Sequence, residues 1–343
     1  MSGPGRFKGG AARLMAGASA AIATLVFLIV LALAWGLWTY NGAGPKSPDG
    51  RPVTVVLRPG AGVREIAASL TRAGVVQSSA VFSAAAQLTG QARRLKAGEY
   101  EFPSRMSMAG VMRKIRLGQI VHHEVTIPEG LTSEMAVDIL MAQPLLTGAA
   151  PVPPEGSLLP ETYEYRRGED RGVVLGRMMA ARDSLLKQLW AQRAEGLPFA
   201  TPDEAVTLAS IVEKETRLPV ERPHVARVFI NRLQMGMKLQ SDPTIIYDVS
   251  QGRPLGRGIR ESELHAATPH NTYVIAGLPP TPICNPGKAS LTAVMAPSPG
   301  KDLFFVADGT GGHVFSETDA EQAKNVAKWR VIENNQTAAE KGR

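Results

Sequence analysis

The sequence predicts an α+β protein that is held by a single N-terminal transmembrane helix. Three observations indicate this. A long uncharged apolar stretch lies near the N-terminus, later segments switch between the two-residue period of strands and the 3.6-residue period of helices, and 34 glycines and 25 prolines punctuate those segments. The chain has 343 residues, 44% hydrophobic and 20% charged, which is enough for two folded modules after the membrane segment. We expect a small α+β module followed by a larger mixed α/β module.

The apolar stretch covers residues 14–40 and contains no charged side chain. About 20 apolar residues are enough to cross the hydrocarbon core as a helix. Because three basic residues precede the stretch, we expect residues 1–13 in the cytoplasm and the rest of the chain outside it; these are Arg6, Lys8 and Arg13. A cleaved signal peptide is the alternative. Its apolar region is only ~7–15 residues long, so the longer stretch favours a retained helix.

The net charge of +7 has to be divided before it says anything about partners. Three of the positive charges precede the apolar stretch, which leaves +4 for an exported part that does not meet nucleic acid. Anionic lipid headgroups or an acidic polymer of the cell envelope are the partners this charge allows. Cys284 is the single cysteine, so we expect no intramolecular disulfide, and we expect no metal and no cofactor.

The elements after the apolar stretch follow from periodicity and turn residues. Residues 41–51 are rich in glycine and proline and are typical of a tether. Residues 52–126 are predicted to form the small module in the order β-α-α-β-α-β. Its strands are expected at 53–57, 98–102 and 121–127, with helices from 63 to Gly74, at 79–88 and from 108 to Gly118.

A connecting region over residues 127–200 contains a helix at about 174–191. Residues 201–333 are predicted to form the larger module, and residues 334–343 a frayed tail. The module starts at a strong helix signal, because Thr201 can cap the helix and Glu204 completes a capping box. A second helix is expected at about 220–235.

Two glutamates on the first helix of the larger module are candidates for acid and base chemistry. At ~100° per residue, Glu213 and Glu215 lie on the two flanks of the apolar face, and Lys214 between them points away from it. A carboxyl group held against apolar side chains has a raised pKa, as a general acid near neutral pH requires. The alternative is a solvated flank with Glu213 paired to Arg217. Periodicity does not choose between the two glutamates.

Polar residues beside rigid turns are candidates for sugar contacts. The segments 237–244 and 270–273 are polar, and the loop 277–287 contains four prolines, which stiffen it as one wall of a cleft. Amide, hydroxyl and carboxylate side chains here could hydrogen bond to sugar hydroxyl and acetamide groups. These candidates are Gln240, Asp242, Asn271 and Tyr273. The same residue types also form ordinary turns.

Four long strings in this order closely resemble the endolytic murein transglycosylases of the YceG-like family. They are LASIVEKET, VFINRLQMGMKLQSDPTIIY, HNTYVIAGLPPTPICNPGKASLTAVMAPS and LFFVADGTGGHVFS. The resemblance spans roughly residues 50–332, and GEYEF, IPEGLTSEMA and EGSLLPETYEY add weaker likeness. It implies a lysin-motif-like module at 52–126 and a catalytic transglycosylase module at 201–333. The chain departs from the family pattern at Gly156-Ser157-Leu158, where the family commonly has an aromatic residue after the glycine.

The resemblance also implies a reaction. Glu213, the first glutamate of the VEKE string, would protonate the β-1,4 bond between N-acetylmuramic acid and N-acetylglucosamine within nascent strands. It would then deprotonate the C6 hydroxyl as a 1,6-anhydro ring closes, which makes the protein a lyase without metal or cofactor. Asp242 and Glu161 are candidates for orienting the N-acetyl group of the substrate.

The expected partners are peptidoglycan strands and peptidoglycan synthases, the penicillin-binding proteins, at the bacterial inner membrane. Three other interpretations stay open from the sequence. They are a peptidoglycan-binding scaffold without activity, a two-carboxylate hydrolase that uses Glu213 with Asp242, and a lipid-binding surface protein.

Overall fold

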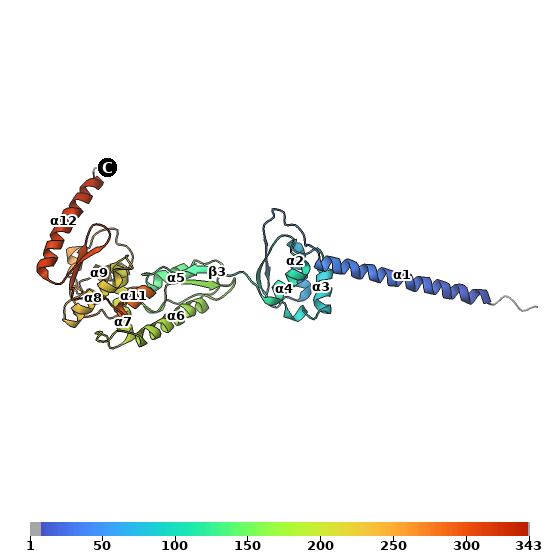
Figure 1. Cartoon of the computed structure of the whole chain (residues 1–343), viewed down its shortest axis with the longest axis horizontal. Coiled ribbons are helices and arrows are strands. Elements are labelled where there is room, and N and C mark those ends of the chain that lie inside the picture. The colour runs from blue at the N-terminus through green and yellow to red at the C-terminus, as the bar shows by residue number, and fades with distance from the viewer. Residues whose placement is uncertain (1–7, 342–343) are drawn as a thin grey trace, which may run out of the picture. The chain divides into compact units, whose positions relative to one another are not determined.

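The computed structural model describes residues 8–341 and the side chains of residues 21–335. The chain forms two compact units, Met1–His122 and His123–Arg343, and each is described by itself. The elements are labelled in Figure 1.

The first unit begins with α1 (Lys8–Asn41). Within the described residues, Ala21–Asn41 is the one stretch of helix long and apolar enough to cross a membrane; its most apolar part is unburied, and Thr39 near its end is buried. This agrees with the predicted transmembrane helix, although a signal sequence has the same properties. The predicted orientation depends partly on Arg6, which lies outside the described residues, so it stays a prediction.

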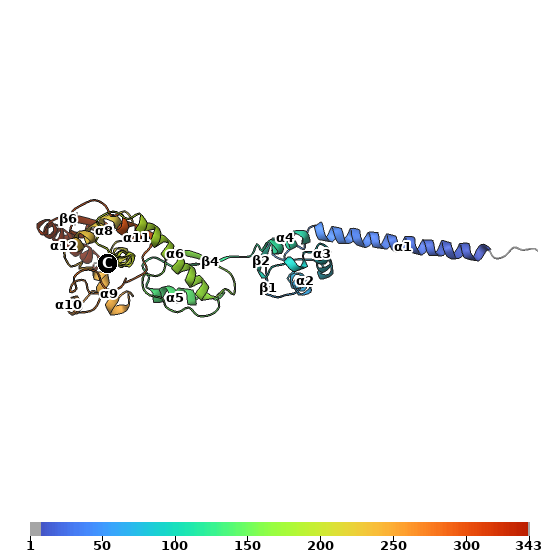
Figure 2. The same ribbon diagram turned by 90° about the horizontal axis from the view of Figure 1, so that it is seen from below.

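The rest of the first unit is a small module around a two-stranded antiparallel sheet. β1 (Val53–Leu57) pairs with β2 (Gly98–Phe102). Three α-helices accompany the sheet, namely α2 (Val63–Arg72), α3 (Ser79–Leu88) and α4 (Met108–Leu117), with a short 3-10 helix at Ala92–Arg94 (Figure 2). Phe82, Tyr100 and Phe102 are fully buried between these elements. The first five predicted elements of the module are therefore confirmed in kind and order.

The end of α1 is part of this module. It packs against α3 and α4, and the Tyr40 hydroxyl lies 3.9 Å from Sδ of Met112. The Gly44 amide donates to the Arg105 carbonyl at 3.2 Å, and the Arg105 amide donates to the Pro45 carbonyl at 3.0 Å. A Cβ at Gly44 would collide with the Met106 carbonyl oxygen. The segment expected as a tether is therefore hydrogen bonded to the module at its beginning.

The strand expected at 121–127 forms as β3 (His123–Thr126), but it belongs to the second unit. It pairs antiparallel with β4 (Thr162–Tyr165) and places Val125 opposite Tyr163. The helices α5 (Ser133–Met141) and α6 (Arg171–Ala191) supply the apolar side chains of the same core. An alternating pattern identifies a strand but not its partner, which is why the predicted module ended four residues too late.

The larger core of the second unit is formed by helices. α7 (Pro202–Glu215), α8 (Arg222–Gln234) and α11 (Lys288–Met295) pack on one another, and α9 (Asp242–Ser250) packs on α7. The predicted capping box is present, because Thr201 accepts from the Glu204 amide and Glu204 accepts from the Thr201 amide. Ala205 to Val212 are all buried, so α7 runs through the core and delivers its last turn to the site.

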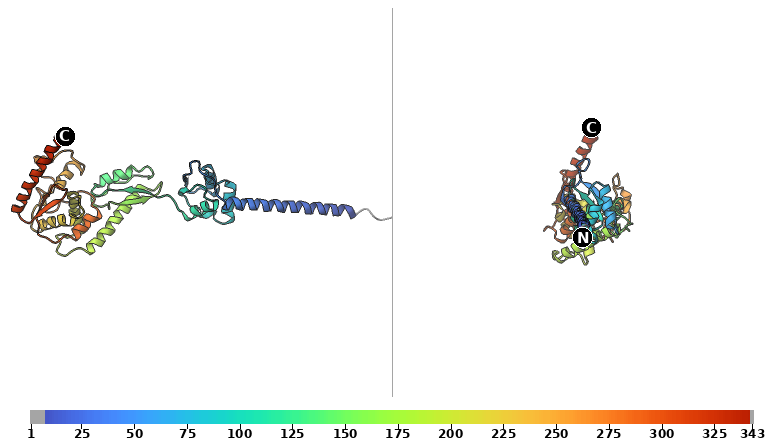
Figure 3. Two further views of the ribbon diagram at one scale, coloured as in Figure 1. Left: turned by 45° about the horizontal axis from the view of Figure 1, so that its top comes forward. Right: turned by 90° about the vertical axis from the view of Figure 1, so that its right-hand side faces the viewer.

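The remaining elements close the second unit. α10 (Glu261–Leu264) is a single turn, and β5 (Phe304–Ala307) pairs antiparallel with β6 (His313–Ser316). The closing helix α12 (Asp319–Lys341), red in Figure 3, begins at a capping box formed by Thr318 and Glu321.

Candidate active site

Glu213 lies in the last turn of α7, and its side chain is 5% exposed. Its two carboxylate oxygens have different partners. Oε1 contacts Nη2 of Arg222 at 3.0 Å, and Oε2 accepts a hydrogen bond from the Gly287 amide at 2.9 Å. The pairing with Arg217 considered from the sequence is replaced by this pairing with Arg222. Both oxygens act as acceptors, so the carboxylate is held in one orientation.

Arg222 is shared between two carboxylates. The same Nη2 lies 3.3 Å from Oε2 of Glu129, which comes from the turn between β3 and α5. Burial and the Glu213 carboxylate raise the pKa of Glu129, and the Arg222 guanidinium opposes this. Nε of Arg222 is buried without a hydrogen-bond partner in the described part of the chain. The ion pair of Glu213 and Arg222 is therefore largely buried, whereas the Glu129 side chain is 41% exposed.

Backbone from the proline-rich loop completes this cluster. A Cβ at Gly287 would collide with the Glu129 carboxylate, so only glycine allows the loop to approach both glutamates. On the neighbouring turn, the Lys214 ammonium donates to the Gly130 carbonyl at 3.2 Å. The loop 277–287 was expected to form a wall of the site, and its end contributes an N–H group directly to Glu213.

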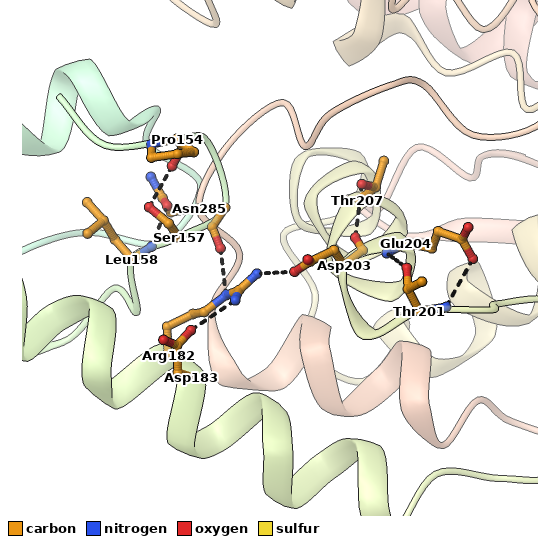
Figure 4. A network of polar contacts seen from close by, with 11 residues as sticks. Pro154, Ser157, Leu158, Arg182, Asp183, Thr201, Asp203, Glu204, Thr207 and Asn285 are labelled. Carbon is orange, nitrogen blue, oxygen red and sulfur yellow. Dashed lines mark hydrogen bonds and ion pairs between the residues drawn. The ribbon is translucent and has the colours of Figure 1, made fainter.

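Asn285 fixes this loop to two others. Its Oδ1 accepts from the Leu158 amide at 2.9 Å, and its Nδ2 donates to the Leu131 carbonyl at 3.2 Å and to the Ser133 hydroxyl at 3.1 Å. Asn285 is fully buried. Figure 4 shows Asn285 beside Ser157 and Leu158. The Ser157-Leu158 stretch, where the chain departs from its family pattern, is thus part of the wall that supports the site.

A second set of contacts in Figure 4 ties α6 to α7. Arg182 on α6 donates from Nη2 to Asp203 at 2.8 Å and from Nε to the Gly156 carbonyl at 2.9 Å. The start of α7 and the 154–158 turn are therefore held by one side chain. These contacts support the frame around Glu213 rather than the reacting groups.

Glu215 lies on the opposite flank of α7 and has other neighbours. Its Oε2 accepts from the Ser241 hydroxyl at 2.7 Å, just before α9. Burial raises the pKa of Glu215 to about 7, with a further contribution from the charge of Asp242. The expectation that apolar surroundings raise a carboxyl pKa on this helix therefore holds for Glu215.

Two of the predicted sugar contacts lie on the Glu215 side. The Tyr273 hydroxyl donates to Oδ1 of Asp242 at 2.6 Å, and burial and the Asp242 carboxylate raise the pKa of Tyr273. Gln240 is exposed and has a left-handed backbone with φ of 54°. Its side-chain oxygen lies 3.4 Å from Nη1 of Arg232. The structure thus brings Gln240, Asp242 and Tyr273 together, but near Glu215.

The other two predicted contacts lie apart from this group. Asn271 is fully buried, and its amide group donates to the carbonyl oxygens of Glu263, Leu264 and Ala266 and accepts from the Tyr273 amide. Its hydrogen-bonding groups are therefore used within the protein. Glu161 is exposed and lies close enough to Glu129 for its charge to raise the pKa of Glu129.

Sequence reasoning gave no role to Glu129, Arg222 or Asn285. The available signal for Glu129 was its place in the IPEG turn, where a charged residue stands between proline and glycine. Arg222 looked like an ordinary residue at a helix start. Asn285 stood in the stiff loop as one more turn former. Each gains its role from a contact between segments far apart in sequence.

The site and fold define a class: an α+β protein with a candidate N-terminal membrane span and a buried glutamate, paired with an arginine, that has the chemistry of a proton-transfer group. The family model described as the YceG-like family matches residues 55–328, and the chain belongs to this family.

Known relatives agree with this assignment. The chain is 29% identical over 326 residues to a protein of Streptococcus pneumoniae named endolytic murein transglycosylase, covering 80% of this chain and 58% of that protein. A Bacillus subtilis protein of the same name is 31% identical over 184 residues, 53% of this chain and 49% of that protein. The chain thus spans about half the length of these relatives. A crystal structure of a YceG-like protein from Listeria monocytogenes matches with a TM-score of 0.51 and 26% identity, over 80% of this chain and 98% of that one.

Proposed function

We propose that this protein is a membrane-anchored murein transglycosylase that cuts within peptidoglycan glycan strands. The bond is the β-1,4 link between N-acetylmuramic acid and N-acetylglucosamine, and the product carries a 1,6-anhydro-N-acetylmuramic acid end. The observation that carries the proposal is Glu213, a nearly buried carboxylate in the family's VEKE string, held by Arg222 and the Gly287 amide. The names of the S. pneumoniae and B. subtilis relatives support the substrate class.

In this mechanism Glu213 takes part in two proton transfers. Protonated Glu213 gives its proton to the glycosidic oxygen as the bond to C1 breaks, and the N-acetylglucosamine side leaves with a free 4-hydroxyl. The C6 hydroxyl of the muramic residue attacks C1, and Glu213 takes up its proton. No water is consumed, and Glu213 ends protonated as it began. The attack is intramolecular, so no nucleophilic side chain is required.

The neighbours of Glu213 control its position during these steps. The Gly287 amide and Arg222 hold both oxygens when the carboxylate is ionised. When Glu213 carries a proton, one of these contacts has to yield, and Arg222 keeps its contact with Glu129. Glu129 thereby gives Arg222 an alternative partner while Glu213 is neutral.

The substrate contacts are assigned by position. Glu161, on the Glu129 side, is our candidate for orienting the N-acetyl group that stabilises charge at C1. Gln240, Asp242 and Tyr273 are candidates for binding a more distant sugar, because their polar groups gather near Glu215. Asn271 is better understood as a structural residue that supports α10, since its amide bonds to three carbonyls there.

The first unit fits the role of membrane anchor and glycan-binding module. Its β-α-α-β core supports a lysin-motif-like module, which would bind peptidoglycan close to the membrane. With its N-terminus in the cytoplasm, α1 would keep the second unit outside the inner membrane, where nascent strands are made. Cleavage there would end strand elongation, and penicillin-binding synthases would be the natural partners.

Digestion of purified, uncrosslinked glycan strands tests the proposal. Glu213→Gln is expected to abolish anhydro-ended products, while Glu195→Gln, an exposed change in the same unit, leaves them unchanged. Products heavier by one water would instead identify a two-carboxylate hydrolase. Retained strand binding with no cleavage by the unsubstituted protein would identify a scaffold. If Glu215→Gln abolishes cleavage and Glu213→Gln does not, Glu213 is not the acid.

A further inference from the structure

Positive charge is concentrated in the part of the chain that follows the apolar helix. Residues 42–122 contain 12 Lys and Arg against 4 Asp and Glu, whereas residues 123–343 contain 23 against 27. The part of the first unit that follows the helix therefore carries a net charge of +8, and the second unit carries a net charge of −4. An exported protein of mild overall positive charge is in fact one strongly basic module and one weakly acidic unit.

The acidic residues of this module neutralise little of the positive charge on α4 and on the segments before it. Glu65 pairs with Arg58, and Asp49 lies next to Arg51. The basic residues of α4 and of the preceding segments are different. Arg113 and Arg116 form no ion pair with a side chain in the described part of the chain, and Arg93 and Arg94 are exposed nearby in sequence on the short 3-10 helix.

A hollow of about 310 Å³ places two of these arginines at a defined level of the membrane. It is lined by Tyr40, Gln91, Ser107, Ala109, Gly110, Arg113 and Arg116. Tyr40 belongs to the last turn of the apolar span Ala21–Asn41, where Trp35 and Trp38 are also exposed. Aromatic rings at the end of a membrane helix lie at the headgroup level, so the hollow opens there as well.

The packing of α1 fixes this relation. Its end contacts α3 and α4, Tyr40 reaches Met112 on α4, and the backbone pairs at residues 44–45 and 105 tie the following chain to the same turn. Figure 2 shows the end of α1 beside α4 and α3. The module cannot turn its α4 side away from the bilayer without breaking these contacts.

We propose that the hollow between Tyr40 and α4 binds the phosphate headgroup of an anionic phospholipid through Arg113 and Arg116. Gln91 and the Ser107 hydroxyl, which caps α4 by accepting from the Gly110 amide, add polar groups to the lining. The remaining basic residues provide a broader attraction to the anionic leaflet. This inference depends on the membrane anchor of the proposed function but not on its catalytic step.

The natural tryptophans at the end of α1 allow a direct test. The full-length protein, with Trp190→Phe and Trp329→Phe so that Trp35 and Trp38 report alone, is reconstituted in phosphatidylcholine vesicles. A small fraction of either brominated phosphatidylglycerol or brominated phosphatidylcholine is included as the quencher. We expect phosphatidylglycerol to quench more strongly at equal mole fraction, and the excess to shrink at high salt.

Substitutions separate a specific site from net charge. Arg113→Gln with Arg116→Gln is expected to reduce the preference for phosphatidylglycerol by about 30-fold or to abolish it. Arg113→Lys with Arg116→Lys retains most of it. The matched control is Arg64→Gln with Arg72→Gln, which removes two exposed charges from α2 and is expected to leave the preference intact. All of these side chains are at the surface, and circular dichroism verifies the fold.

Several results would overturn the headgroup site. Equal quenching by both lipids in the unsubstituted protein is one, and an equal loss of preference in the α2 control is another, since only net charge would then matter. Absence of quenching by either lipid would show that the helix is outside the bilayer. That result also removes the anchor, whereas loss of glycan cleavage in Glu213→Gln would stand independently.

Discussion

Glu215→Gln should make the second unit more stable at pH 8 and leave its stability at pH 4 almost unchanged. Burial raises the pKa of the Glu215 carboxyl from 4.5 to about 7. Between these values the folded protein holds a proton that the unfolded chain has released. The unfolding free energy therefore contains a contribution that is complete below about pH 4.5 and is lost as the pH rises through about 7. Glutamine is neutral at every pH and keeps an acceptor for the Ser241 hydroxyl.

The size of this effect follows from the shift. One pKa unit corresponds to 1.36 kcal/mol, so the rise of the Glu215 pKa from 4.5 to about 7 gives at most about 3 kcal/mol. The groups that face Glu215 set the direction. The Asp242 charge and burial favour the neutral acid, and the Ser241 hydroxyl, His313 and Arg232 oppose them.

Urea unfolding of the full chain in detergent, followed by Trp190 fluorescence from pH 4 to pH 8, measures this difference. Trp190 lies on α6 and packs against the core around α7, so it reports on the unit that contains Glu215. Glu155, whose pKa burial also raises to about 7, adds a pH dependence of the same sign, and Glu155→Gln measures its share. The reasoning fails if the difference between Glu215→Gln and the unsubstituted protein is the same at both ends of the pH range.

Three further changes test the contacts around Glu213. Gly287→Ala should lower the rate of glycan cleavage, because the added methyl group displaces Glu129 and moves the Gly287 amide that donates to Glu213. A cleavage assay of this variant, with Glu213 intact, measures the change in rate. Asn285→Ala should reduce the unfolding free energy by about 3 kcal/mol, because the substitution leaves the buried Leu158 amide without a partner. Urea titration measures this loss, and a change below about 0.5 kcal/mol would contradict the prediction. Glu129→Gln removes the second carboxylate partner of Arg222, which Arg222 keeps in the proposed mechanism while Glu213 is neutral, so the rate of glycan cleavage should fall; an unchanged rate would contradict this.

Elements with their own start and stop signals could be predicted from the sequence. α3 and β2 have the predicted bounds, and Gly118 ends α4 in the left-handed conformation expected of a helix cap. The short helices α9 and α10 were not predicted. α10 is one turn long, and it is stabilised by the amide of Asn271, which follows Leu264 by seven residues, rather than by its own periodicity. Helical periodicity carries no information about such a partner.

The sequence predicted only those features of the site that follow from the geometry of a single helix. The sequence located two glutamates on opposite flanks of α7, which the structure confirms. Their different surroundings come from residues that lie at least nine positions away in sequence. Glu129 is 84 residues before Glu213, and Gly287 is 74 residues after it. Nothing near Glu213 in the sequence indicates either contact.

The arrangement of carboxylates also bears on the choice between a transglycosylase and a hydrolase. Glu213 and Glu215 point to opposite sides of α7, and Asp242 lies with Glu215, so neither is a natural second carboxylate for Glu213. Glu129 is close enough to Glu213 to be a second carboxylate. Oε2 of Glu129 and Oε1 of Glu213 contact the same nitrogen of Arg222, at 3.3 and 3.0 Å. A retaining hydrolase places its carboxyl groups ~5–5.5 Å apart with the sugar between them. Here the space between the two oxygens holds the buried Arg222 guanidinium, and a sugar could enter only by displacing it. This arrangement favours the proposed transglycosylase, in which one carboxylate serves as both acid and base, over the two-carboxylate hydrolase.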